Sequence, residues 1–289
     1  MCAHFAPSRI LIKMYSGTTL TPLSGRIVGA HQKIDRLAYD ALKSASPKAI
    51  FPSKRQILHF EGVNGPDAIK RKSPAKDEPW HYYAPFDETD IKLLDIITEH
   101  HRLLTQALRE KDQVRASFEA AWLAHAIVDG LTPAHHYPYE EELSELRGGL
   151  GIESRTTIKQ KLVMPGETRR KQAHNNWKMW GPKGLLTTHG LFEWGVAAII
   201  LPLTAKSTRI QITDHDLKEL DEYGLLELFR RKAREVAALN MYDEYYKQGW
   251  TPHLARQVRK QLAPMIIKTV ALAWYSASRE SRRRKAPSV

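Results

Sequence analysis

Apolar side chains recur every three or four positions along most of this chain, which is the spacing of one buried face of an α-helix. The pattern predicts helices over five ranges: Ile27 to Leu42, Thr89 to Leu108, Leu185 to Leu203, Leu217 to Leu239 and Leu254 to Tyr275. A further helix is predicted to begin after Asp112 and to carry His125. Because the strict alternation that marks a half-buried strand is scarce, the sequence predicts an all-α, multi-helix protein.

The expected ends of these helices follow from residues that cap or interrupt helical hydrogen bonding. Side-chain oxygens that can accept from the first helical turn precede four of them: Thr89 or Asp90, Asp112, Thr213 and Thr251. The helix from Leu185 is expected to end near Pro202. Pro264 has no backbone N–H to donate, so it predicts a kink in the last helix.

Two stretches lack the helical pattern. Lys48 to Pro85 is rich in proline, glycine and charge, and we expect an ordered loop there. Gly148 to Gly184 holds several glycines and many basic residues, which is typical of a loop insertion. We therefore expect one helical domain over residues 25–278 that includes this insertion, with an N-terminal extension over 1–24 and a basic tail over 279–289.

The net charge of +12 and the single cysteine narrow the function classes. Cys2 alone cannot form an internal disulfide or a cysteine-based zinc site, so any metal must be held by His, Asp and Glu. The chain has no run of 18 apolar residues and no apolar signal region near its start, which predicts a cytoplasmic or peripheral membrane protein. The basic charge, concentrated partly in Arg279 to Lys285, favours phosphate-bearing partners, either an anionic membrane surface or nucleic acid. Alternatively, these basic residues could simply belong to a solvated loop and tail that bind no such partner.

The strongest chemical signal is the segment WLAHAIVDGLTPAHH, which starts at Trp122. His125 and Asp129 are four positions apart on a predicted helix, so both side chains project from one face, one turn apart. Their neighbours are apolar, which indicates a buried helix. Burying an imidazole and a carboxylate without a partner is unfavourable, and a metal ion removes that penalty. His135 follows from the turn after this helix.

A second pair, His189 and Glu193, has the same four-residue spacing in another apolar segment. Two such pairs favour a metal site, although each could instead be an internal His–carboxylate hydrogen bond. Asp67 and His81 are fourteen positions apart in the expected loop, where Asp77 competes with Asp67. His31 lies on the first predicted helix, where a lone histidine is usually a satisfied core or surface residue.

In combination, these residues resemble the zinc-dependent phospholipase C family, which is related to the S1/P1 nucleases. That family is all-α and binds three zinc ions. Its pattern is a helix-borne His, an Asp followed fourteen residues later by His, then His-x3-Asp-x5-His, and finally His-x3-Glu. This chain carries the pattern in order: His31; Asp67 and His81; His125, Asp129 and His135; His189 and Glu193. The HYYAPFD run, which contains Tyr82 and Tyr83, also resembles the aromatic-rich stretch of the family.

The resemblance implies two or three zinc ions per chain. One ion would be held by four residues: Asp67, His81, His125 and Asp129. A second would be held by His135, His189 and Glu193, and a third by His31 with Asp129 as a bridge. Mixed nitrogen and oxygen ligands with open positions suit catalytic zinc, which acidifies water and neutralises charge developing on a phosphoryl group. Asp67 is then a candidate general base, and Tyr82 and Tyr83 are candidate substrate-binding residues.

The chain departs from the family in three respects. The third family zinc is completed by an N-terminal Trp, but no Trp precedes Trp80 here, so His4 or water would have to replace it. The basic insertion separates His135 from His189 by far more residues than in small family members. The family is secreted, whereas no secretory signal is recognisable in this chain.

The leading functional hypothesis is a zinc-dependent hydrolase of phosphate esters that cleaves a phospholipid in the manner of phospholipase C. Glu193 favours this branch, since the nucleases have Asp at that position, and Trp177 and Trp180 are candidate anchors to a lipid surface. One alternative is a single-strand nuclease, in which basic charge follows the backbone and aromatic side chains stack on bases. A second alternative is a non-catalytic, zinc-stabilised protein that binds nucleic acid or lipid.

Overall fold

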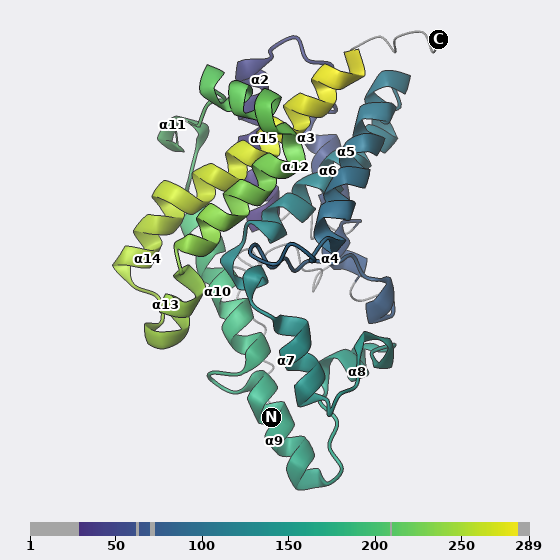
Figure 1. The fold of residues 1–289 in the computed structure, drawn as a ribbon, viewed down its shortest axis with the longest axis vertical. Coiled ribbons are helices and arrows are strands. Elements are labelled where there is room, and N and C mark those ends of the chain that lie inside the picture. The colour runs from purple at the N-terminus through teal and green to yellow at the C-terminus, as the bar shows by residue number, and fades with distance from the viewer. Residues whose placement is uncertain (1–28, 62–63, 70–72, 209, 283–289) are drawn as a thin grey trace, which may run out of the picture.

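The computed structural model of the chain describes residues 29–61, 64–69, 73–208 and 210–282 (Figure 1). Within these ranges every regular element is a helix, which confirms the all-α prediction. None of the described helices is long and apolar enough to cross a membrane. The expected N-terminal extension over 1–24, with His4, lies outside the described residues, as does the start of the first predicted helix.

A bundle of long helices forms the core. Its members are α2 (Ala30–Ala45), α5 (Lys92–Glu110), α6 (Gln113–Gly130) and α15 (Ala263–Arg282). Helix α6 packs against all three others, and its side chains are buried on almost every side from Ala116 onward. This agrees with its nearly continuous apolar sequence, because a helix that is apolar all round is stable only when surrounded by protein.

A side chain from the far end of the sequence ties this bundle together. Trp274 on α15 is fully buried, and its indole Nε1 donates a hydrogen bond to the backbone oxygen of Ala120, 2.9 Å away. Buried tryptophans stabilise cores through their large apolar area, provided that the N–H finds an acceptor. This hydrogen bond joins α15 to α6, although the two residues are separated by half the chain.

The C-terminal helices cover one side of the bundle. Helix α12 (Asp214–Ala238) packs on α15 and is followed by α13 (Met241–Gln248) and α14 (Pro252–Gln257). One continuous helix was expected from Leu217 to Leu239, but Gly224 interrupts it with φ 72° and ψ 170°, a conformation that glycine adopts without steric strain. The kink expected at Pro264 takes the form of a π-helical turn over Val258–Leu262. Such a turn shifts the hydrogen-bond register ahead of a residue that cannot donate.

Three of the four predicted caps are confirmed. Asp112, Thr213 and Thr251 each accept a hydrogen bond from a backbone N–H of the following first turn. The prediction for Thr89 and Asp90 is wrong, because α5 begins at Lys92 without a side-chain cap. Asp90 instead accepts a hydrogen bond from the backbone N–H of Ala84, 2.8 Å away.

The stretch 48–85, expected to be a loop, contains helices. These are α3 (Lys54–Glu61), α4 (Pro66–Ile69) and the short 3-10 helix η1 (Ala75–Asp77). Helix α3 packs against α6 and α2, so it belongs to the bundle. The Ser53 side chain accepts from the N–H of Gln56, whose own side chain accepts from the N–H of Ser53. This reciprocal capping pattern marks the start of a helix, even though the charge-rich composition of the segment suggested a loop.

The stretch 148–184 was also expected to be a loop, and it too is largely helical. Together with α7 (Tyr139–Leu146) it forms a protruding lobe whose elements are η3 (Ile152–Ser154), α8 (Ile158–Leu162) and α9 (Arg169–Trp180), at the lower end of Figure 1. A small separate core holds the lobe together through Tyr139, Leu143, Met164 and Met179.

Helix α10 (Leu185–Ile200) runs from this lobe into the bundle and contacts α9, α7 and α2. It ends just before Pro202, as predicted. The short helix α11 (Ala205–Thr208) follows. The basic tail was expected to begin at residue 279, but α15 continues to Arg282. Arg279 belongs to this helix, and its Nη2 pairs with Asp221 Oδ1 at 2.6 Å. Residues 283–289 lie outside the described part of the chain.

Candidate metal centre

The end of α6 and the turn after it supply three of the expected ligands. His125 and Asp129 lie one turn apart on α6, and His135 lies on the 3-10 helix η2 (Pro133–His136), which opens with a proline in its first position. Gly130 is required where α6 ends, since a Cβ there would lie 2.5 Å from Phe229 Cζ. The missing side chain lets α6 approach α12 closely enough to bury this end of the helix.

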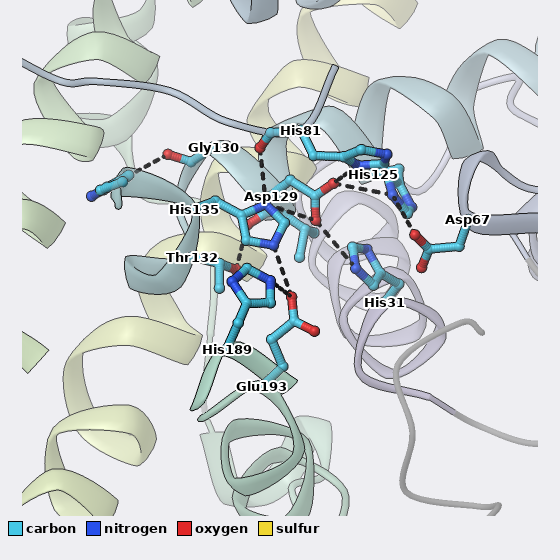
Figure 2. A network of polar contacts seen from close by, with 12 residues as sticks. His31, Asp67, His81, His125, Asp129, Gly130, Thr132, His135, His189 and Glu193 are labelled. Carbon is cyan, nitrogen blue, oxygen red and sulfur yellow. Dashed lines mark hydrogen bonds and ion pairs between the residues drawn. The ribbon is translucent and has the colours of Figure 1, made fainter. Parts of the chain in front are cut away.

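Asp129 is the hub of the cluster (Figure 2). Its Oδ2 lies 2.5 Å from His81 Nδ1 and 3.1 Å from His125 Nε2. Its Oδ1 lies 3.4 Å from His31 Nε2 and 3.7 Å from His135 Nδ1. One carboxylate from α6 is thus surrounded by four imidazoles from four segments of the chain.

A second focus lies at Glu193 on α10. Its Oε1 lies 2.8 Å from His135 Nε2 and 3.2 Å from His189 Nε2. The rings of these two histidines stack with their centroids 5.0 Å apart. His135 therefore stands between the two carboxylates and connects the Glu193 focus to Asp129.

The structure brings together all eight sequence-predicted metal ligands. They fall into three groups whose ligand atoms lie within 4.8 Å of one another: His31, His125 and Asp129; Asp67, His81 and His125; and His135, His189 and Glu193. Asp67 Oδ1 lies 3.9 Å from His125 Nε2. Seven of the eight are buried and Glu193 is partly buried, so this is an internal cluster of opposite charges.

Two of the histidines have their Nδ1 atoms occupied by acceptors outside the cluster. His125 Nδ1 lies 2.8 Å from Glu61 Oε1, and His135 Nδ1 lies 2.9 Å from the backbone oxygen of His81. An acceptor on Nδ1 fixes the proton there and leaves Nε2 with a free lone pair. His125 Nε2 faces Asp129, and His135 Nε2 faces Glu193.

Burial and mutual attraction act in opposite directions on the pKa values of these groups. Burial alone would raise the pKa of Asp129, but the surrounding imidazoles of His125, His135 and His81 hold it well below its usual value. The pKa of Glu193 is likewise held well below its usual value, against the effect of burial, by His189 and His135. Both carboxylates are therefore ionised at neutral pH and available as metal ligands.

The imidazole of His125 responds in the opposite direction. Burial by itself lowers its pKa, but Asp129 and Glu61 raise that pKa well above the usual value. Without a metal ion, the carboxylates therefore retain a proton on this ring. A cation in the same position would replace that proton, which is how metal sites release protons on loading.

Two acidic residues of the site were missed from the sequence. Glu61 on α3 is fully buried against His125, and it was overlooked because its segment was expected to be a loop. Asp35 lies one turn after His31 on α2 and is buried; burial, followed by the charge of Glu61, raises its pKa well above the usual value. The four-residue spacing that identified His125 with Asp129 also joins His31 to Asp35 and would have found it.

The two candidate substrate-binding tyrosines have different surroundings. Tyr82 is half-buried beside the cluster, with its ring centroid 5.4 Å from that of His135, and it stacks on Tyr139. Tyr83 points into the main hydrophobic core, where its ring lies 5.5 Å from that of Phe229. The structure therefore supports a position beside the site for Tyr82 and a packing role for Tyr83.

The donor set fits zinc. The cluster offers imidazole nitrogens and carboxylate oxygens, the ligand types of catalytic zinc, and each of its three groups leaves coordination positions open. His125 Nε2 is buried and lies 3.1 Å from Asp129 Oδ2 and 3.9 Å from Asp67 Oδ1. A cation at this position would face the same two carboxylates and take the place of the proton that Asp129 and Glu61 hold on the His125 ring.

Comparisons of this chain with protein-family models, with curated proteins and with solved structures return no match.

Proposed function

We propose that this chain is a zinc-dependent hydrolase of phosphate diesters, with a cleavage chemistry of the phospholipase C type. One observation carries the proposal: five histidines and three carboxylates from separate segments of the chain converge in three groups around Asp129 and Glu193, two of which share His125. An internal His–carboxylate hydrogen bond would need only two residues. A cluster of several metal ions instead needs ligands that contact more than one partner. Asp129 and His125 each belong to more than one set of contacts, as sharing requires.

The roles of the residues follow from their positions. His31, His125 and Asp129 would hold one ion, Asp67 and His81 with His125 a neighbouring one, and the group around Glu193 another. Zinc bound there supplies Lewis-acid chemistry, acidifying water and neutralising charge on a phosphoryl group. Glu61 and the backbone oxygen of His81 orient the imidazoles.

Asp67 is the proposed general base. It lies in one group with His81 and His125, and its Oδ1 is 3.9 Å from His125 Nε2, so it would stand beside water bound to an ion held by these residues. A carboxylate beside a bound metal ion can accept a proton from the water that the ion activates. Tyr82, beside His135 and Tyr139, would line the approach of the substrate.

The test is hydrolysis of p-nitrophenyl phosphorylcholine and of single-stranded DNA by the purified chain, with and without a chelator. We expect chelator-sensitive turnover of the phosphorylcholine ester. Asp67→Asn should lower kcat by about 10²-fold or more, the usual contribution of a general base. Asp77→Asn is the matched control, because Asp77 is an exposed aspartate of the same segment and should leave kcat unchanged.

Turnover of DNA alone would favour the single-strand nuclease over the phospholipase. Absence of turnover with both substrates, in protein that contains zinc, would contradict the enzymatic proposal and favour a zinc-stabilised binding protein.

A further inference from the structure

The lobe formed by residues 139–184 carries an unusual number of exposed apolar side chains. Trp177 is 66% exposed and Trp180 45% exposed, and three aliphatic residues of α8 and its end are also exposed: Ile158, Leu162 and Val163. Exposed tryptophans next to exposed aliphatic residues are uncommon on protein surfaces that face only water.

One hydrogen bond joins the two helices that carry these side chains. The indole Nε1 of Trp180 donates a hydrogen bond to the backbone oxygen of Leu162, 2.7 Å away, which places the end of α8 beside the end of α9. Asn175 and Met179 form the buried face of α9. At 100° per residue, Trp177 points almost directly away from that face, toward solvent.

The lobe is also basic. From residue 155 to residue 183 the chain has eight Lys or Arg side chains and a single acidic one, Glu167. Arg155 and Lys161 pair with glutamates, whereas the other six form no ion pair with any described residue. Arg170 is exposed two helical turns before Trp177 and therefore shares its side of α9.

We propose that this lobe is a docking surface for an anionic lipid bilayer. Tryptophan is favoured at membrane–water interfaces, where its ring lies at the level of the headgroups, and lysine and arginine attract anionic headgroups. The aliphatic residues of α8 favour lipid over nucleic acid as the occupant, because stacking on bases requires aromatic side chains and gains nothing from isoleucine, leucine or valine.

The lobe is placed to bring such a surface toward the metal centre. Helix α9 packs on α10 and α7, and α10 carries both His189 and Glu193 (Figure 1). Tyr139 of α7 also lies 5.1 Å from the ring of His189. The assignment of the docked surface to substrate delivery rests on the proposed function, whereas the docking itself can be measured without turnover.

The test is co-flotation of the full chain with vesicles of phosphatidylglycerol and phosphatidylcholine, compared with vesicles of phosphatidylcholine alone. We expect binding only to the anionic vesicles. Arg169→Glu with Arg170→Glu should weaken it at least about tenfold, since each basic residue near anionic lipid contributes roughly fivefold. Trp177→Ala should weaken it several-fold.

Two matched variants separate the lobe from general effects of charge and exposure. Arg109→Glu with Arg256→Glu makes the same change in net charge at exposed positions outside the lobe, and Phe86→Ala removes an aromatic side chain that is 72% exposed elsewhere. Both should retain nearly full binding. Losses equal to those of the lobe variants would overturn the proposal, as would binding of single-stranded DNA, but not of vesicles, that the lobe substitutions abolish.

Turnover of soluble p-nitrophenyl phosphorylcholine, measured on the same preparation, separates this proposal from the preceding one. Vesicle binding without turnover would support the docking surface and contradict the enzymatic function. Turnover without vesicle binding would overturn the docking surface and leave the enzymatic function standing.

Discussion

The imidazoles of His31 and His125 lie against each other, with ring centroids 4.1 Å apart and planes 12° apart. Glu61 Oε1 faces the Nδ1 atoms of both rings, at 3.6 Å from His31 and 2.8 Å from His125. Asp129 faces the Nε2 atoms of both rings from the other side. Two carboxylates from different helices therefore fix the orientation of two ligands that belong to the same metal group.

Replacing Glu61 with Gln should weaken zinc binding without unfolding the chain. The amide keeps the size of the side chain but removes the charge that holds His125 Nδ1–H, and loss of such a partner usually lowers metal affinity about 10- to 100-fold. Competition with a chromophoric chelator measures this affinity. Glu119→Gln is the matched control, because Glu119 is equally buried and pairs with His100 outside the cluster. An equal loss of affinity in both variants would indicate a general effect on the fold and contradict a positioning role for Glu61.

Among the helices, α10 links the lobe to the metal centre and is held by a close contact with the loop before α14. Trp250 stacks on Phe192 of α10, and a Cβ at Gly195 would lie 2.0 Å from its ring. The opposite situation exists at Gly190, where a Cβ would meet nothing within 4 Å. A side chain is therefore excluded at Gly195 but has room at Gly190 on the same helix.

Gly195→Ala should destabilise the fold by about 1–3 kcal/mol, because the tryptophan ring packed on Phe192 must move. Gly190→Ala should instead stabilise it by up to about 1 kcal/mol, since alanine reduces the entropy lost when a helix forms. Urea unfolding monitored by circular dichroism measures both changes in the free energy of unfolding. Equal effects at the two positions would mean that the Gly195–Trp250 contact does not constrain α10.

The helices that sequence periodicity predicted are the long ones whose apolar faces meet the bundle, such as α5, α6 and α10. Their pattern is visible because packing requires a continuous apolar stripe over several turns. Helices α3 and α9 are shorter and charged, so their stripe is brief, and only the caps at Ser53 and Thr168 mark their beginnings. The missed helix α3 carries Glu61, which is why that residue escaped prediction.

The ligand set itself was predictable because the four-residue spacing of His125 with Asp129, and of His189 with Glu193, places both side chains of a pair on one helical face. Periodicity could not indicate that α2, α3, α6 and α10 meet at one point, since that depends on packing between distant segments. The contacts of Asp129 with His31 and His81 are set by this tertiary arrangement. His31 and His81 were predicted as ligands only because the order and spacing of all eight residues resemble the ligand pattern of a known family.

The molecule as a whole combines a helical bundle that encloses the candidate metal centre with a basic, partly apolar lobe beside it (Figure 1). The bundle supplies His31, His125 and Asp129 from buried helices, while α10 brings His189 and Glu193 from the direction of the lobe. Such burial of titratable groups is unfavourable unless opposite charges or a cation compensate it. A bound metal cluster is therefore the central claim about this protein.

Zinc stoichiometry by elemental analysis of the purified chain tests that claim most directly, with Asp129→Asn as the comparison. We predict two or three zinc ions per wild-type chain, one for each occupied group of ligands, and fewer in Asp129→Asn, because Asp129 belongs to the group of His31 and its Oδ2 also faces His81 and His125 of the neighbouring group. A folded wild-type chain that binds no zinc above the buffer level, or equal zinc in both proteins, would contradict the account.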